Sequence, residues 1–201
     1  LSTIAPDGII ATALIVMRGP VLYHELSEEC RKLSHWLRYE FIYQTDRSYE
    51  ANFDASFRCL VEDGVVRRDG NMVIIQAPKT LNFYRSILRH LIDGYWLTAD
   101  ALRSLAKGSV ERKSWVKLAL EHGDRELLQG FIKRSESVST AVIQNALKLF
   151  ENEKLVAIRK VQQNNKTSQF LTLGDTSTLE ELALRRDELG VYLASDPLDT
   201  Q

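Results

Sequence analysis

The sequence is poor in cysteine and has no excess of charge of either sign. Two cysteines, Cys30 and Cys59, occur among 201 residues, too few for a disulfide framework. We expect both to be free thiols in a reducing, intracellular compartment, with a single bridge as the alternative. Lys and Arg number 26 and Asp and Glu 27, which gives a net charge of -1. No overall field therefore attracts nucleic acid or an anionic membrane, and only a local patch could do so.

Long apolar runs and processing signals are also missing. The apolar run from Gly8 to Met17 has half the length of about 20 residues that a membrane-spanning helix needs. It is not a signal peptide, because no basic region precedes it and no small-residue cleavage site follows it. The chain opens on Leu1 rather than Met, so we expect it to be a piece of a longer protein.

Motifs that carry catalysis, cofactors or metals are not found. There is no Gly-x-Ser-x-Gly elbow, phosphate-binding glycine loop or dinucleotide fingerprint. Zinc would need His24, Cys30, His35 and Cys59, but zinc sites begin as close pairs such as Cys-x2-Cys, and none occurs here. Cys30 instead falls on an apolar helical stripe, which predicts a buried thiol. We therefore predict no cofactor and no metal site.

A possible acid–base pair, His122 and Asp124, has a simpler explanation. The two residues flank Gly123, which we take as the end of a helix. A cationic histidine in that position is stabilised by the helix dipole. We predict no catalytic residue in this chain.

The residues that are present predict a mainly helical α+β protein. Apolar residues make up 44% and charged residues 26%, as in ordinary globular domains. Apolar side chains recur at helical spacing in most of the chain. The expected helices cover residues 9–17, 22–37, 49–61, 81–91, 99–106, 115–122, 127–132, 139–150 and 178–189, with Thr98 as the N-cap of the fifth.

Two β-hairpins interrupt the helices. The first follows the helix of residues 49–61 and Gly64, and consists of two β-prone runs around Asp69-Gly70. The second joins strands over 155–161 and 169–173 through Asn164-Asn165. Residues 57–66 resemble residues 147–156, so we interpret the two as copies of one helix-plus-hairpin, winged-helix-like unit. The predicted domains are 1–97 and 98–190, followed by a flexible tail over 191–201.

A winged-helix pattern requires that nucleic acid be weighed as a partner. A recognition helix needs cations to meet phosphates. Here the first candidate helix carries Glu50, Asp54, Glu62 and Asp63 against Arg58, and the second carries Glu151 and Glu153 against Lys148. The hairpins are more basic, with Arg67, Arg68, Arg159, Lys160 and Lys166. The acidic helices disfavour a nucleic-acid partner, and a protein-binding winged-helix adaptor remains as the other alternative.

The order of several short segments resembles the C-terminal region of the glycerol-3-phosphate and dihydroxyacetone-phosphate acyltransferases. In that family a helix ending near Arg-Gly leads to a Val-rich stretch and then to an aromatic-Tyr-Lys/Arg-Asn-Asn-x-x-His segment. Arg18-Gly19, residues 60–66, and Phe83-Tyr84-Arg85 with His90 stand in those places. Residues 143–160 are similar to the end of the family's region. Ser86 and Ile87 replace the two Asn of the pattern.

The resemblance implies an enzyme whose chemistry lies outside this chain. The family transfers an acyl group from acyl-CoA, or from acyl carrier protein in some bacteria, to glycerol 3-phosphate for phospholipid synthesis. Its His-x4-Asp motif is missing: the fifth residues after the four histidines are Glu29, Glu40, Tyr95 and Leu127. We therefore expect a module that is inactive alone and supports the catalytic domain of the same polypeptide.

The resemblance also suggests where such a module makes contacts. Aromatic and cationic side chains gather in one segment and suit an interface with the catalytic domain or, peripherally, with a membrane. The alternative is that the same apolar residues are simply core. The expected location is intracellular and membrane-associated through the parent enzyme. The candidate interface residues are Phe83, Tyr84, Arg85, Ile87, Arg89, His90 and Trp96.

Overall fold

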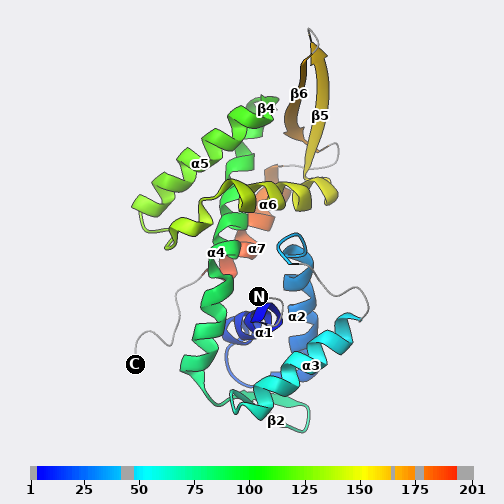
Figure 1. The fold of residues 1–201 in the computed structure, drawn as a ribbon, viewed down its shortest axis with the longest axis vertical. Helices are drawn as coiled ribbons and strands as arrows, with labels where there is room; N and C mark the ends of the chain where they lie inside the picture. Colours follow the sequence, from blue (N-terminus) through cyan, green and yellow to red (C-terminus); the bar gives the residue numbers. More distant parts are fainter. Residues whose placement is uncertain (1–3, 42–47, 164–165, 175–178, 194–201) are drawn as a thin grey trace. The chain divides into compact units, whose positions relative to one another are not determined.

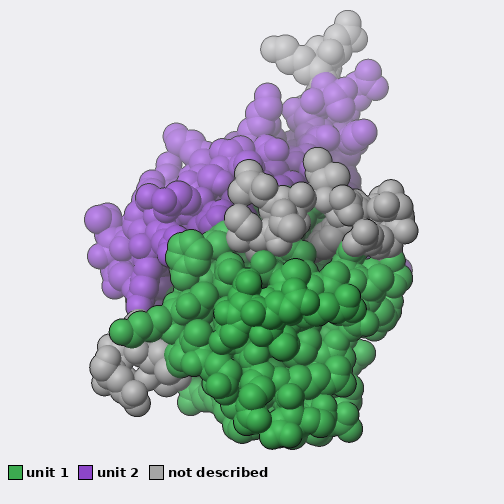
Figure 2. Space-filling model, turned by 60° about the horizontal axis from the view of Figure 1, so that its bottom comes forward, with its two compact units in different colours: residues 1–89, 194–201 green, residues 90–193 purple. Residues whose placement is uncertain are grey.

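A computed structural model describes residues 4–41, 48–163, 166–174 and 179–193. These residues form two compact units, and the boundary falls inside one helix, between Arg89 and His90 (Figures 1 and 2). The prediction of a mainly helical α+β protein is confirmed, because the described part has seven α-helices and two three-stranded antiparallel sheets. The predicted domain limits, 1–97 and 98–190, remain a prediction.

Unit 1 begins with an apolar helix and contains a small sheet. Its sheet has the order β1-β3-β2, and β3 pairs antiparallel with both neighbours. Tyr23 N–H donates to the Asn71 carbonyl at 2.8 Å, which joins the start of α2 to the hairpin turn. The elements are α1 (Ile4–Met17), β1 (Val21–Leu22), α2 (Tyr23–Trp36), α3 (Tyr49–Glu62), β2 (Val66–Asp69), β3 (Met72–Ile75) and the first part of α4 (Pro78–Leu102).

Unit 2 repeats this order with a longer hairpin. Its sheet has the order β4-β6-β5, again with antiparallel pairing throughout. After the rest of α4 come the short 3-10 helix η1 (Arg103–Lys107), β4 (Val110–Glu111), α5 (Arg112–Leu128), the 3-10 helix η2 (Ser135–Ser137), α6 (Thr140–Asn152), β5 (Val156–Gln163), β6 (Lys166–Leu173) and α7 (Leu179–Val191).

Both predicted hairpins are present, and each gains a third strand that the sequence did not indicate. β1 and β4 have two residues each, too few to show the alternation that marks a strand. The predicted turn at Asn164-Asn165 lies outside the described residues. So does most of the predicted tail, although Val191 closes α7 and Tyr192 is buried.

The helices before the two hairpins end in the same way. Gly64 and Lys154 both have positive φ, 69° and 60°. In each case the next residue donates its N–H five residues back, Val65 to the Leu60 carbonyl and Leu155 to the Phe150 carbonyl. This is the Schellman motif at the C-terminus of a helix. The apolar pair that it joins is buried in both cases, Leu60 with Val65 and Phe150 with Leu155. The similarity of residues 57–66 and 147–156 is therefore a real structural repeat.

One prediction follows from the lysine in the left-handed position. Lys154→Gly should raise the free energy of unfolding by about 0.5–1 kcal/mol, because a side chain with a Cβ is strained at φ 60° whereas glycine is not. Gly64→Ala should lower it by a similar amount. Urea denaturation of both variants checks this. Equal effects of the same sign would contradict it.

A second repeat links the first helices of the two units. Asp-Gly-x3-Thr-Ala occurs at residues 7–13 and again at 93–99. In both copies the buried threonine donates its hydroxyl to the glycine carbonyl at 2.7 Å. Both glycines also lie where a Cβ would meet a neighbouring element, at Leu88 for Gly8 and at Val142 for Gly94. The motif therefore marks a close packing point in each unit.

Two predicted helix boundaries are wrong. Thr98 is not an N-cap: it lies inside α4, where its hydroxyl bonds the Gly94 carbonyl. Gly123 does not end a helix either, because α5 continues to Leu128. A Cβ at Gly123 would lie 2.7 Å from Leu97 Cδ2 and 2.8 Å from Val138 Cγ1. This glycine is needed for close packing rather than for a turn.

The predicted helix over residues 127–132 is absent for a related reason. Leu127 and Leu128 form the last turn of α5, and Gly130, at φ 79°, then turns the chain away. Of the four apolar residues that suggested this helix, Ile132 is buried, whereas Leu128 and Phe131 are 88% and 64% exposed.

Each unit contains buried aliphatic and aromatic side chains. Cys30 is buried, as predicted, and its burial raises the pKa of the thiol well above its usual range. Cys59 is exposed, and both cysteines are free. Across the described residues, no helix combines the length and the apolar character that crossing a membrane requires.

Candidate functional site

All seven candidate interface residues lie on α4, but they do not share one environment. Phe83 is 63% exposed and its ring centroid lies 5.9 Å from that of Tyr84. Tyr84, Ile87, Arg89, His90 and Trp96 are partly exposed. Arg85 is only 6% exposed. His90 and Trp96 belong to unit 2, and the other five residues belong to unit 1.

Two of these residues differ from Phe83 in their surroundings. Arg85 is buried, so its guanidinium is not exposed for an outside contact. Trp96 lies beside α7, since a Cβ on Gly190 would be 3.6 Å from its Nε1. The exposed part of the candidate surface is therefore centred on Phe83, with Tyr84 and Ile87 beside it.

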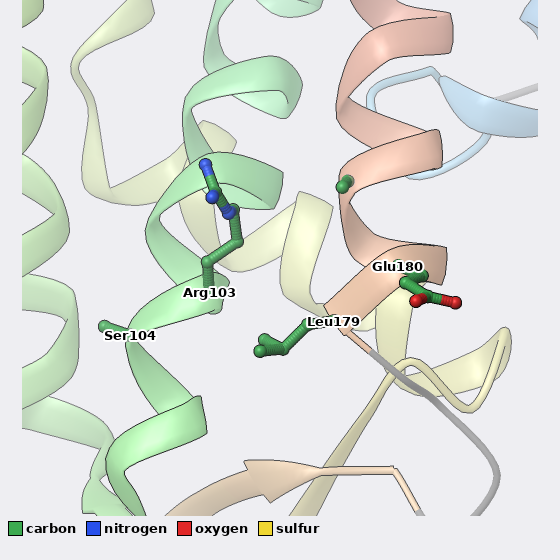
Figure 3. A pocket seen from close by; sticks show the side chains of 5 residues that line it. Arg103, Ser104, Leu179 and Glu180 are labelled. Atoms are coloured by element: carbon green, nitrogen blue, oxygen red, sulfur yellow. The ribbon is translucent and has the colours of Figure 1, made fainter.

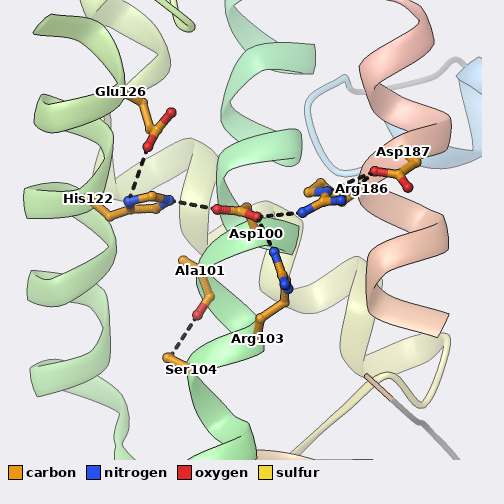
Figure 4. A network of polar contacts seen from close by, with 8 residues as sticks. All are labelled: Asp100, Ala101, Arg103, Ser104, His122, Glu126, Arg186 and Asp187. Carbon is orange, nitrogen blue, oxygen red and sulfur yellow. Dashed lines mark hydrogen bonds and ion pairs between the residues drawn. The ribbon is translucent and has the colours of Figure 1, made fainter. Parts of the chain in front are cut away.

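A cluster of charged side chains in unit 2 was not predicted. His122 Nε2 lies 2.9 Å from Asp100 Oδ2, and Arg186 Nη1 donates to Asp100 Oδ1 at 3.1 Å (Figure 4). Arg103 reaches the same Oδ1 at 3.3 Å. His122 Nδ1 lies 3.6 Å from Glu126 Oε1. The cluster thus connects α4, η1, α5 and α7 within one unit.

The electrostatics of the cluster follow from these contacts. The hydrogen bond from His122, helped by those from Arg186 and Arg103, lowers the pKa of Asp100 from 3.8 to about 2, although partial burial acts in the opposite direction. Asp100 is therefore a carboxylate at all ordinary pH values. It accepts hydrogen bonds from three side chains and so connects α4 to η1, α5 and α7.

The geometry does not suit general-base catalysis by His122. A general base needs one ring nitrogen directed at the substrate proton while a carboxylate orients the other nitrogen. Here both nitrogens face carboxylates of the chain itself, Asp100 and Glu126. The pairing with Asp124 that the sequence suggested is not the one observed. The cluster stabilises unit 2.

A shallow depression lies next to this cluster. Its volume is about 420 Å³, and η1 and α7 contribute its lining (Figure 3). The lining has one cation and one carboxylate, and no histidine or cysteine: Arg103, Ser104, Leu179, Glu180 and Ala183. This set offers neither a nucleophile–base pair nor an anion cradle. Among the residues that the structure describes, no three His, Cys, Asp or Glu side chains gather as metal ligands.

The cluster could not be found from residue spacing. Asp100, His122 and Arg186 belong to three separate helices, and only tertiary packing brings them together. The close packing points were detectable, because Asp-Gly-x3-Thr-Ala is repeated in the sequence.

Comparison with known proteins gives the family. The model of the glycerol-3-phosphate acyltransferase C-terminal region matches residues 1–159, which cover unit 1 and unit 2 as far as β5. No curated protein matches the chain. The match agrees with the resemblance seen in the short segments around Arg18-Gly19 and Phe83-Tyr84-Arg85. The chain belongs to the glycerol-3-phosphate acyltransferase C-terminal region family.

Proposed function

We propose that this chain is a non-catalytic module that supports the catalytic domain of a glycerol-3-phosphate acyltransferase. The observation that carries the proposal is membership of the C-terminal family combined with the missing His-x4-Asp motif. His122, the one histidine bonded to an aspartate in the described residues, has both nitrogens directed at carboxylates. The module would bind the catalytic domain and stabilise the arrangement in which acyl-CoA and glycerol 3-phosphate react.

The architecture supports a role in binding. Each unit has the order helix, short strand, two helices and hairpin, and the second strand of the hairpin, β3 or β6, is the central strand of its sheet. We propose that each unit acts as a winged-helix-like unit, which presents its helices and hairpin to a partner. The first candidate recognition helix, α3, carries Glu50, Asp54 and Glu62, so a protein partner is favoured over nucleic acid for unit 1.

The contact surface in this proposal is the exposed side of α4 in unit 1. Phe83 is a large apolar side chain in water, and such residues anchor interfaces when a partner covers them. Tyr84 stacks beside it in a tilted arrangement. Arg85 and Trp96, which we first grouped with this surface, would act indirectly by supporting α4. The membrane location of the parent enzyme remains an expectation.

Phe83→Ser should weaken binding of the catalytic domain tenfold or more, since burying an aromatic side chain contributes roughly 1.5–3 kcal/mol and about 1.4 kcal/mol corresponds to a factor of ten. Leu184→Ser is the matched control, because Leu184 on α7 is also 63% exposed but lies outside the proposed surface. The measurement is titration of a separately expressed catalytic domain, together with an assay of acyl transfer to glycerol 3-phosphate.

Three results would count against the proposal. The first is acyl transfer by the purified chain alone. The second is absence of any complex with the catalytic domain. Equal weakening by Phe83→Ser and Leu184→Ser would leave the partnership intact but reject α4 as the contact surface.

A further inference from the structure

The sheet of unit 2 has one long strand at its edge. β6 is the central strand, with β4 on one side and β5 on the other. Among the strands that the structure describes, none pairs with β5 on the side away from β6 (Figure 1). β5 has eight residues, and each is opposed to one residue of β6 without a bulge. β5 therefore presents a continuous edge to which a further strand can be added.

The ladder shows which backbone groups of β5 face this edge. Gly174 N–H donates to the Leu155 carbonyl at 3.2 Å, and these two residues are opposed in the register of β5 and β6. In an antiparallel ladder, opposed pairs that exchange hydrogen bonds alternate with opposed pairs that do not. The odd-numbered residues of β5 therefore bond β6, whereas Ile158, Lys160 and Gln162 direct their N–H and C=O groups toward the open side.

The corresponding edge strand of unit 1 is shorter, and its cations have partners close by. β2 has four residues. Arg67 Nη1 lies 3.2 Å from Asp69 Oδ2 in the same strand. Arg68 donates to the Gly70 carbonyl, and its guanidinium lies 4.0 Å from the centre of the Tyr23 ring. Short edge strands are one way in which proteins avoid pairing with other chains, so the long edge is specific to unit 2.

The side chains along the β5 edge follow a definite order. Arg159 and Lys160 are adjacent, and both are exposed. Ile158 on one side of them is partly exposed, and Val161 on the other side is 37% exposed. Residues 154–173 contain no Asp or Glu, although the net charge of the chain is -1. The edge therefore presents two cations between two branched aliphatic side chains.

We propose that β5 binds an extended acidic segment of a partner protein as a fourth strand of this sheet. Strand addition of this kind takes its affinity from main-chain hydrogen bonds and its specificity from side chains. Directly opposed residues of two strands lie close together, and opposite charges there are favourable. An antiparallel partner strand thus needs acidic residues opposite Lys160 and Arg159, flanked by apolar residues opposite Val161 and Ile158. The expected recognition sequence is apolar-acidic-acidic-apolar.

A second copy of this chain is the less suitable occupant. An antiparallel pair of two β5 strands centred on Arg159 or Lys160 would oppose like charges, which is unfavourable. A pair centred on Ile158 would place the two cations opposite Ala157 and Val156 of the other copy, so neither charge would be compensated. The edge is therefore complementary to an acidic strand rather than to itself.

The test measures fluorescence anisotropy of a labelled peptide, Val-Glu-Glu-Val flanked by threonines, with the full 201-residue chain. We expect saturable binding, and none by a Val-Lys-Lys-Val peptide. Arg159→Gln combined with Lys160→Gln should weaken binding about fivefold, from two opposed charge pairs at about two- to threefold each. The control, Arg67→Gln with Lys79→Gln, removes two exposed cations from unit 1 and should change the affinity less than about twofold. Circular dichroism checks that both variants are folded.

Backbone substitutions distinguish strand addition from general attraction of charge. N-methylation of the first Glu of the peptide, opposite Lys160, removes an N–H that should bond the Lys160 carbonyl, and we expect about tenfold weaker binding. N-methylation of the second Glu, opposite Arg159, alters an N–H that points away from β5 and is the matched control. In the chain, Lys160→Pro removes an outward N–H without interrupting the bonds to β6. It should bind the peptide more weakly than Lys160→Gln, which removes the same charge.

Several outcomes would overturn the proposal. These are no binding of the Val-Glu-Glu-Val peptide, equal binding of the Val-Lys-Lys-Val peptide, or an equal loss on N-methylation of either Glu. Dimerisation of the chain that Lys160→Pro abolishes, without binding of the peptide, would show that a second copy occupies the edge. The proposed function concerns α4 of unit 1, so Phe83→Ser should leave peptide binding unchanged. A negative peptide result therefore leaves the catalytic-domain titration unaffected.

Discussion

Gly94→Ala is expected to lower the free energy of unfolding by about 2 kcal/mol or more. A Cβ at this position would lie 2.4 Å from Val142 Cγ1 and 2.9 Å from the backbone oxygen of Ser137. Overpacking costs about 1–3 kcal/mol and occasionally more, and we expect the upper end of this range because the backbone at Ser137 would have to move. The helical preference of alanine over glycine returns at most about 1 kcal/mol. The steric cost therefore decides the sign.

Gly190→Ala is the matched control for this prediction. Gly190 also lies in a helix, α7, but the nearest atom to its Cβ position is Trp96 Nε1 at 3.6 Å, an ordinary contact. This variant should be neutral or slightly more stable. Adding Val142→Ala to Gly94→Ala should recover part of the loss, because it removes the closer of the two clashing groups. Urea denaturation measures all three, and a Gly94→Ala chain as stable as the parent would refute the close-packing argument.

Asp100→Asn is expected to destabilise unit 2 by about 2 kcal/mol at neutral pH. The amide cannot accept charge-assisted hydrogen bonds from His122, Arg186 and Arg103 as the carboxylate does. Loss of a fully buried ionic partner costs about 3–5 kcal/mol. The Asp100 side chain is 19% exposed, so we expect a smaller value because water screens part of the interaction. Asp124→Asn, which removes an exposed carboxylate of α5, is the control and should change stability by less than about 0.5 kcal/mol.

The same carboxylate predicts how stability depends on acid. Its pKa is lowered from 3.8 to about 2 in the folded chain, so the folded state binds the proton less readily than the unfolded state. The contribution to stability is fully present above about pH 4 and is lost as the pH falls toward about 2. Asp100→Asn should reduce the change of the thermal unfolding midpoint with pH over that range. Asp124→Asn should leave this pH dependence unchanged. An identical acid slope in the parent and in Asp100→Asn would show that Asp100 does not carry this stability.

Local patterns in the sequence were sufficient to predict most of the helices, the two hairpins and the family. Apolar side chains at helical spacing predicted α2, α3 and α6 because one face of each is buried. Asp69-Gly70 predicted the first hairpin because glycine reaches the left-handed conformation that the turn requires. The short segments from Arg18-Gly19 to His90 indicated the acyltransferase C-terminal region, and the family match over residues 1–159 agrees.

Where the helices continue and which charged side chains meet depends on tertiary packing. Gly123 and Thr98 have the local chemistry of helix ends, yet both lie inside helices. The first leaves room for Leu97 and Val138, and the second bonds the carbonyl of its own helix. His122 bonds Asp100 rather than Asp124 because the tertiary fold places Asp100 Oδ2 2.9 Å from His122 Nε2. Residue spacing carries information about one helix at a time, whereas close approach and ion pairing depend on atoms from elements far apart in the chain.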